Sequence, residues 1–184
     1  MVLTKTVCRI SCLLIILLVS GCSGITVSQD YSSARELAGL RFYAWSSEQQ
    51  PRTGDVRVDT LLLDSRIRSA IDNTLAARGY RQADSDHADF LVSYQYSLHQ
   101  RVRGTSDHAS IGFAGRHSFF GFGTGTTISD YNEGLLLIDF LDRTGRTTLW
   151  RGKGSRPIAT HTEPEKLTHQ INEMVHKIID QFPP

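Results

Sequence analysis

The sequence has few cysteines, no excess of either charge and only one long apolar run, and each shortage excludes a class of protein. It contains 3 cysteines in 184 residues, and its 20 Lys and Arg residues against 19 Asp and Glu give a formal net charge of +1. This balance provides no basic field for binding nucleic acid. Because the one long apolar run lies at the N-terminus, multi-spanning transporters and channels are excluded. The chain is 40% hydrophobic, which is enough for a folded core.

The apolar run at residues 10–19 follows Lys5 and Arg9, which is the pattern of a secretory signal peptide. The run is too short to span a bilayer as a helix, which takes about 20 residues. It ends in Val19-Ser20-Gly21-Cys22, which resembles the lipobox of bacterial lipoproteins. The resemblance implies cleavage between Gly21 and Cys22 and a lipid on the Cys22 thiol.

Processing at this site would leave no free thiol in the mature chain. Cys8 and Cys12 would leave with the signal peptide and Cys22 would carry the lipid, so no disulfide, thiol catalysis or cysteine-bound zinc is expected. Ser23, in place of aspartate, resembles the signal for outer-membrane sorting. We therefore expect an outer-membrane lipid anchor in a bacterial cell envelope, with the domain facing the periplasm. An ordinary secretory signal or an uncleaved anchor is the alternative.

The chain is expected to contain three segments. Residues 1–21 form the lipoprotein signal peptide, residues 22–37 a lipid-anchored flexible tether, and residues 38–184 a single periplasmic α+β domain. The tether is predicted because its residues are mostly small and polar.

Apolar periodicity predicts two helices within the domain. The first covers about 61–78, capped at its start by Asp59 or Asp64 and followed by Gly79. The second opens at Thr162, which forms a capping box with Glu165.

Strands are expected at residues 40–45, 90–99, 135–141 and 147–152. Residues 90–99 alternate apolar with polar, as in a strand with one buried face. The unbroken apolar run from Leu135 predicts a central strand covered on both faces. The expected fold is α+β, an antiparallel sheet with two main helices packed on one face and a long Gly/Phe-rich loop inserted between strands.

Several of these segments, taken in order, resemble a known family. They read IRSAIDNTLAARGY at 67–80, ADFLVSY at 88–94, EGLLLID at 133–139, LWRG at 149–152 and IIDQFPP at 178–184. This set resembles the bacterial lipoproteins that carry Domain of Unknown Function 4136. The resemblance implies an envelope lipoprotein with one α+β domain, and it supplies no activity and no catalytic residues.

Asp139 lies inside an apolar strand, where a carboxylate without a partner is costly to bury. Arg151 belongs to the strand 147–152, which we expect to form a hairpin with the strand 135–141. We therefore predict that Asp139 and Arg151 form a buried polar pair, and a functional carboxylate at Asp139 is the alternative.

The segment 104–125 combines six glycines with Phe113, Phe119, Phe120 and Phe122. Loops this long in a compact domain are usually functional or disordered. Aromatic rings on such a loop would suit contact with an envelope protein partner, which makes these phenylalanines a candidate interaction surface. The alternatives are that the loop folds back onto the core of its own domain or is disordered.

The sequence contains no recognisable catalytic, nucleotide or metal motif. The glycine-rich stretch at 121–126 lacks the lysine and the following helix of a phosphate-binding loop, so we expect no nucleotide. Neither G-x-S-x-G nor HExxH occurs, and the seven histidines lack the spacing of a metal site. No metal and no other cofactor is therefore expected.

Two functional interpretations remain open. The first is a non-enzymatic envelope interaction or structural module, held at the membrane by the lipid on Cys22, that binds a protein partner and no nucleic acid. The alternative is a small-ligand-binding or enzymatic domain with a cleft under loop 104–125. Asp139 and Arg151 would then line that cleft together with a histidine, which could be His99, His108 or His117.

Overall fold

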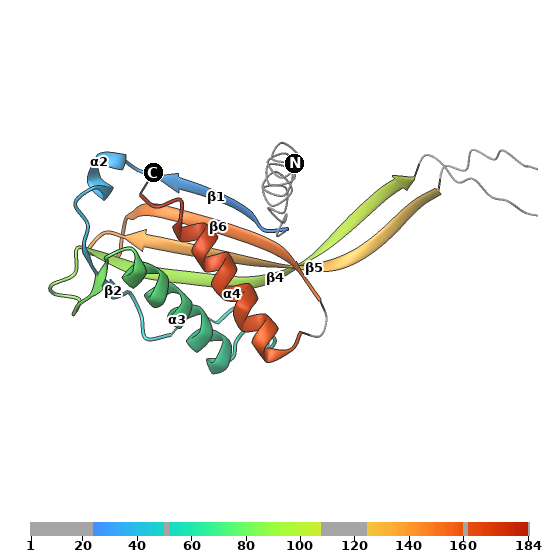
Figure 1. Ribbon diagram of the computed structural model, residues 1–184, viewed down its shortest axis with the longest axis horizontal. Coiled ribbons are helices and arrows are strands. Elements are labelled where there is room, and N and C mark those ends of the chain that lie inside the picture. Colours follow the sequence, from blue (N-terminus) through green and yellow to red (C-terminus); the bar gives the residue numbers. More distant parts are fainter. Residues whose placement is uncertain (1–23, 50–51, 108–124, 160–161, 184) are drawn as a thin grey trace, which may run out of the picture.

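A six-stranded sheet forms the centre of the protein, with strand order β1-β6-β5-β4-β2-β3 (Figure 1). The computed structural model describes residues 24–49, 52–107, 125–159 and 162–183, with the backbone alone at 102–107 and 125–130. The strands are β1 Thr26–Tyr31, β2 Phe42–Trp45, β3 Arg81–Gln82, β4 Phe90–Asp107, β5 Gly125–Leu141 and β6 Thr148–Ile158. The helices are α2 Ala34–Leu37, α3 Leu61–Ala77 and α4 Pro164–Ile179.

The sheet is mixed, and the prediction of a purely antiparallel sheet with two helices was wrong. Strand β2 runs parallel to both β3 and β4, whereas the β4–β5, β5–β6 and β1–β6 pairs are antiparallel. The cause is the order strand, helix, strand. Helix α3 connects β2 to β4 as a crossover, and neighbouring strands joined by a crossover helix run parallel. The short α2 is the third helix.

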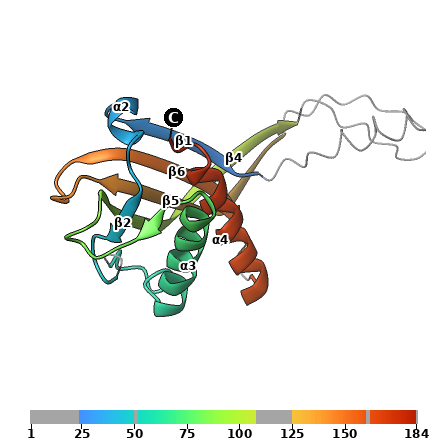
Figure 2. The same cartoon turned by 60° about the vertical axis from the view of Figure 1, so that its left-hand side comes forward.

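Helices α3 and α4 lie side by side over one face of the sheet (Figures 1 and 2). They run in the same direction, because the residues that end them, Arg78 and Asp180, form an ion pair with 2.9 Å between Nη1 and Oδ1. Thr60 caps the start of α3 by accepting from the Leu63 amide, so neither Asp59 nor Asp64 is its cap. Gly79 follows α3 with a φ of +88°, a conformation that glycine adopts without strain.

The predicted capping box of α4 is absent. The helix begins at Pro164, its N-cap is Glu163, and no side chain of the N-cap accepts a hydrogen bond. Proline suits the first turn of a helix because it has no amide hydrogen to leave without a partner. The helix therefore starts two residues later than the position of Thr162 suggested.

Aromatic rings fill the core between the helices and the sheet. Phe182, from the segment after α4, lies 4.7 Å from Phe140 and 5.3 Å from Trp150 between ring centroids. Phe90 is 4.8 Å from Phe140 on the neighbouring strand. All four rings are fully buried. The end of the chain is thereby held in the centre of the domain.

The segment 22–37, expected to be a flexible tether, contains a strand and a short helix. Strand β1 pairs with β6 over its whole length, and Gln29 accepts a hydrogen bond of 2.9 Å from the Trp150 indole. Leu37 of α2 is buried in the core. Of the expected tether, only residues 22–25 precede the first strand. The predicted signal peptide, including the Gly21–Cys22 cleavage site, lies outside the described residues.

Strands β4 and β5 continue beyond the rest of the sheet as a two-stranded ribbon (Figure 1). Residues 104–107 pair with residues 125–128 in this ribbon, so the ends of the expected loop 104–125 are strand. Phe113, Phe119, Phe120 and Phe122 lie outside the described residues. Among the described helices, no segment is both long and apolar enough to cross a membrane.

Candidate functional site

The face of the sheet opposite α3 and α4 carries a group of partly exposed leucines. On β5, Leu136, Ile138 and Phe140 point into the core and are buried. Their neighbours point the other way and remain partly exposed, so the expectation that β5 is covered on both faces was wrong. We call this surface the open face and define it by Leu91, Ser93, Leu135, Leu137, Asp139, Leu141 and Arg151.

The strand register places these leucines together. Leu91 of β4 is paired directly with Leu141 of β5, and Leu137 is paired with Gln95. On the other side, Leu135 is paired with Ser155 of β6. Directly paired residues on one face are neighbours whose side chains touch. The leucines of the open face therefore form two groups, Leu91 with Leu141 and Leu135 with Leu137, and the row of Ser93, Asp139 and Arg151 lies between them. The exposed Lys153 of β6 lies beside Leu137.

Asp139 and Arg151 meet on the open face as a two-armed ion pair. Arg151 donates from Nε to one carboxylate oxygen at 2.6 Å and from Nη2 to the other at 2.7 Å. The Arg151 side chain is 49% exposed and that of Asp139 is 18% exposed. The two residues therefore pair as predicted, but the pair is partly exposed and not buried. The hydrogen bonds to Asp139 raise the pKa of Arg151 further above its ordinary value. The pair adds a fixed polar contact point next to the leucines.

The histidine proposed for a cleft lies far from this pair. Asp139 is opposite Ser93 on β4, and His99 is six residues further along the same strand. At 3.4 Å per residue the separation is about 20 Å. His99 instead contacts Ser97, with 3.0 Å between Nε2 and Oγ. His108 and His117 lie outside the described residues. The structure therefore does not bring Asp139, Arg151 and His99 into one site.

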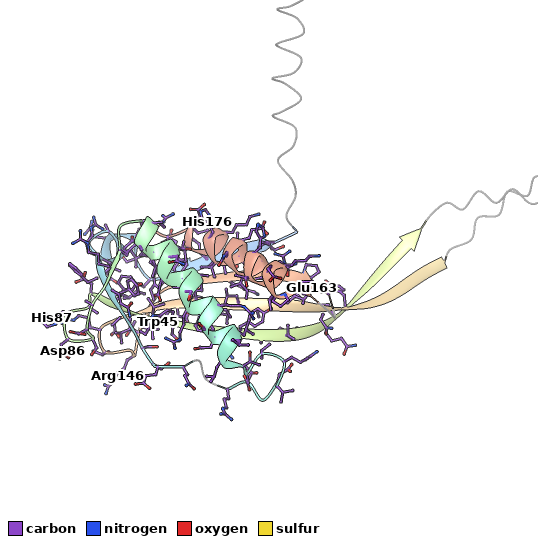
Figure 3. All side chains as sticks on the ribbon, turned by 60° about the horizontal axis from the view of Figure 1, so that its bottom comes forward. Trp45, Asp86, His87, Arg146, Glu163 and His176 are labelled. Atoms are coloured by element: carbon purple, nitrogen blue, oxygen red, sulfur yellow. The ribbon has the colours of Figure 1, made fainter. Side chains whose placement is uncertain are left out.

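On the opposite face, acidic residues of α3 bind aromatic residues of the sheet. Asp72 accepts from the Tyr43 hydroxyl at 2.8 Å and from the Trp45 indole at 3.2 Å. Asp64 accepts from the Tyr94 hydroxyl at 2.5 Å. Arg68 places its guanidinium 4.3 Å above the Trp45 ring, and the labelled Trp45 is seen next to the helix in Figure 3. These contacts fasten α3 to β2 and β4.

The spacing of these α3 residues contains a signal that the sequence analysis missed. Asp64, Arg68 and Asp72 are four residues apart, so they form a stripe of their own beside the apolar stripe. The alternation of β4 places Tyr94 on the helix side, which is where these residues find their partners.

The buried tyrosines make the stability of the protein sensitive to alkaline pH. Burial raises the pKa of Tyr96 from 10.0 to about 12, and burial together with Asp72 and Asp64 raises the pKa of Tyr43 and of Tyr94. The folded protein thus holds these protons more tightly than the unfolded chain. Their contribution to stability is complete below pH 10 and is lost as the pH rises from about 10 towards 12.

We expect the free energy of unfolding to fall between about pH 10 and pH 12, with a slope near 1.4 kcal/mol per pH unit for each proton released only on unfolding. Denaturation curves across this range measure the slope. Tyr94→Phe, which removes one titrating group and keeps the ring, should flatten it by about one proton. A slope that this substitution leaves unchanged would contradict the burial of the Tyr94 proton.

No group of three or more His, Cys, Asp or Glu residues in the described part of the chain is arranged to hold a metal ion. Asp64 and Asp72 both direct their oxygens at hydrogen-bond donors, as described above. The open face offers apolar contact through its leucines and hydrogen bonding at its ion pair.

Comparison with known families identifies a relationship over most of the chain. The family model described as "Domain of unknown function (DUF4136)" matches residues 27–184. The match begins within β1 and includes every strand and helix that follows. No curated protein matches the sequence.

Two solved structures resemble the fold at low identity. A PDZ domain protein from Parabacteroides distasonis shares 12% identity with a TM-score of 0.51, and the match covers 86% of this chain and 36% of that one. The PelC dodecamer from Paraburkholderia phytofirmans shares 17% identity with a TM-score of 0.44, covering 84% of this chain and 94% of that one. The first likeness concerns the fold alone, and the second is too distant to support any inference.

Proposed function

The chain belongs to the DUF4136 family, a family of domains of unknown function, and from this premise we propose that it is a lipid-anchored envelope protein that binds a partner protein through the open face. The observation that carries the proposal is the group of partly exposed leucines on a sheet face opposite both long helices. In this proposal the protein is a binding module and not an enzyme. The anchor and the binding surface are supported by separate observations.

The anchor is supported by the lipobox-like sequence, and the position of β1 indicates which end of the domain it would hold. Strand β1 begins at Thr26, four residues after Cys22. Four residues of extended chain span at most about 14 Å, so a lipid on Cys22 would keep the start of β1 close to the membrane surface. Thr26 is paired with Ser155, near the base of the ribbon. The ribbon end of the domain would thus lie nearest the outer membrane, with the domain in the periplasm.

We expect Cys22→Ser to abolish incorporation of an alkyne-tagged palmitate into the protein, because the only acylated thiol is removed. The readout is tag fluorescence of the immunoprecipitated protein from labelled cells. Cys12→Ser is the matched control, since it removes a signal-peptide cysteine, and it should keep the label. Label retained by Cys22→Ser would contradict the anchor.

The binding surface is supported by its composition. Protein interfaces typically combine an apolar centre with a polar rim. On the open face, Leu135 and Leu137 form the apolar part, and the Asp139–Arg151 ion pair lies beside them. A second ion pair, Arg101–Glu133, lies further along β4 and β5 with 2.9 Å between Nε and Oε2. A partner with apolar side chains and at least one charged group fits this surface.

We expect Leu135→Glu to eliminate partner binding while leaving the domain folded, because the new carboxylate points away from the core. The complex is measured by chemical crosslinking in whole cells, and folding by circular dichroism of the purified protein. Leu62→Glu is the matched control, since Leu62 is 70% exposed at the start of α3, and it should retain the complex. A complex that survives Leu135→Glu would exclude the open face as the contact surface.

A further inference from the structure

The charged residues near the centre of the open face lie in a row across the strands and next to it. The strand register places Asp139 opposite Arg151, and Arg151 opposite Asp30 of β1. Lys153 lies two residues further along β6, beside Leu137. The two acidic and two basic residues cancel, so this surface does not select a partner with a large charge of one sign.

The ion pair in this row retains hydrogen-bonding capacity. Arg151 donates to Asp139 from Nε and Nη2, and among the described residues no group accepts from its Nη1. A guanidinium has five N–H donors, and each carboxylate oxygen can accept two hydrogen bonds. The Arg151 side chain is half-exposed. A second aspartate–arginine pair with the charges reversed would therefore complement this one.

A second copy of the open face presents such a reversed pair when the two faces stack about a two-fold axis that runs between β5 and β6, parallel to them. Asp139 and Arg151 are paired across this axis, so Asp139 of each copy faces Arg151 of the other. The same axis places Leu135 and Leu137 beside their counterparts. An axis across the strands would instead place Asp139 on Asp139 and Arg151 on Arg151, where like charges repel.

The proposed lipid anchor selects the same axis on independent grounds. Strands β5 and β6 run between the ribbon end of the domain and the hairpin around Asp142 (Figure 1). Strand β1 begins at the ribbon end, which is where Cys22 would be held. An axis parallel to the strands keeps both ribbon ends on one side, so both lipids can enter one membrane. An axis across the strands would direct the two anchors in opposite directions.

The area of the face is sufficient for a weak dimer. Strands β4, β5, β6 and β1 give a width of about 19 Å, and residues 133–141 give a length of about 27 Å. Two such faces would bury about 1,000 Å² in total, which is at the lower limit for a specific interface. We therefore expect weak association in solution and stronger association at a membrane, where the anchors confine both copies.

We propose that the partner of the open face is a second copy of this chain, and that the two copies form a parallel two-fold dimer with α3 and α4 on the outside. The inference rests on the proposed function, because it names the partner of the same surface. In this dimer, Leu137 of each copy lies close to the axis and to Leu137 of the other copy.

The first test is crosslinking of the full-length lipidated protein in membranes, where no unmodified cysteine is expected. Leu137→Cys, treated with a short bismaleimide, should give a covalent product of twice the chain's mass. Asn172→Cys, exposed on α4, is the matched control and should stay monomeric. If position 137 forms adducts only with a different protein, the dimer is overturned and partner binding through the open face stands. Failure to form any adduct there would contradict both.

Charge reversal tests the arrangement about the axis. In the Leu137→Cys background, Asp139→Arg places only cations at the axis and Arg151→Asp only anions. Each variant alone should lose at least about tenfold of the crosslinked dimer, because like charges meet. Co-expression of the two variants with different epitope tags should restore a mixed dimer, and circular dichroism verifies folding of each. A dimer unchanged by either reversal, or no mixed dimer from folded variants, would overturn the proposal.

Discussion

Replacing Phe182 by alanine is expected to lower the free energy of unfolding by about 4 kcal/mol, although Phe182 lies near the end of the chain. The ring is fully buried and contacts Tyr80, Phe90, Phe140 and Trp150. Its removal leaves a cavity in the middle of the aromatic cluster, and neighbours on three different strands are too constrained to close it. Denaturant unfolding followed by circular dichroism measures the change.

Phe42→Ala is the matched control for this prediction. Phe42 is 41% exposed on β2, so losing its ring should cost no more than about 1 kcal/mol. Similar losses in the two variants would show that the end of the chain does not complete the core. The backbone carbonyl of Phe182 also accepts from Arg78 at the end of α3, and the alanine variant keeps this contact.

Gly152→Val is expected to destabilise the protein by about 3 kcal/mol, because helix α4 lies directly on the backbone of β6. A β-carbon at Gly152 would collide with the Trp150 ring and with Cγ2 of Ile178 on α4. At Gly154, two residues along the strand, it would come within 2.7 Å of Ile178. The helix would have to move away from the sheet, and Trp150 would lose its position in the core.

Gly39→Val is the matched control, since a β-carbon at Gly39 would meet no atom within 4 Å. Its expected effect is within about 0.5 kcal/mol, as for most surface substitutions. Thermal unfolding of both variants measures the difference. If Gly152→Val were as stable as Gly39→Val, the close packing of α4 on β6 would be wrong.

The segments with strong periodicity were predictable from the sequence. The apolar spacing from Leu63 to Leu75 predicted α3 within one residue of its observed end, and the alternation from Phe90 identified the body of β4. The turn around Asp142 also follows from its residues. Its carboxylate accepts from the amides of Arg146 and Thr147, which closes the hairpin between β5 and β6.

The incorrect predictions concern features that depend on contacts between distant parts of the chain, which the local sequence does not show. Strand β1 reads TVSQDY, and its side chains are almost all exposed, so its existence depends on pairing with β6 and not on an apolar face. The run of apolar residues around Leu137 marks a strand but does not say whether a second layer covers it. The parallel pairing of β2 with β4 follows from the order of elements, which the expected antiparallel sheet overlooked.

The candidate sites were less predictable than the fold. The Asp139–Arg151 contact followed from placing a carboxylate and a guanidinium on adjacent strands, but its exposure depends on which face the helices cover. A cleft between the first turns of α3 and α4 is lined by residues from α3, β4, β6 and the segment before α4, which are separated by up to about a hundred residues of sequence. No short motif contains them.

The measurement that tests the central claim most directly is photo-crosslinking from the open face in living cells. A photoreactive amino acid replaces Leu137 in one protein and Asn172, on the exposed side of α4, in another. Partner binding through the open face predicts a discrete crosslinked protein from position 137, its loss when Leu135→Glu is added, and no such product from position 172. The absence of a product from position 137, or equal yields from both positions, would contradict the proposed function.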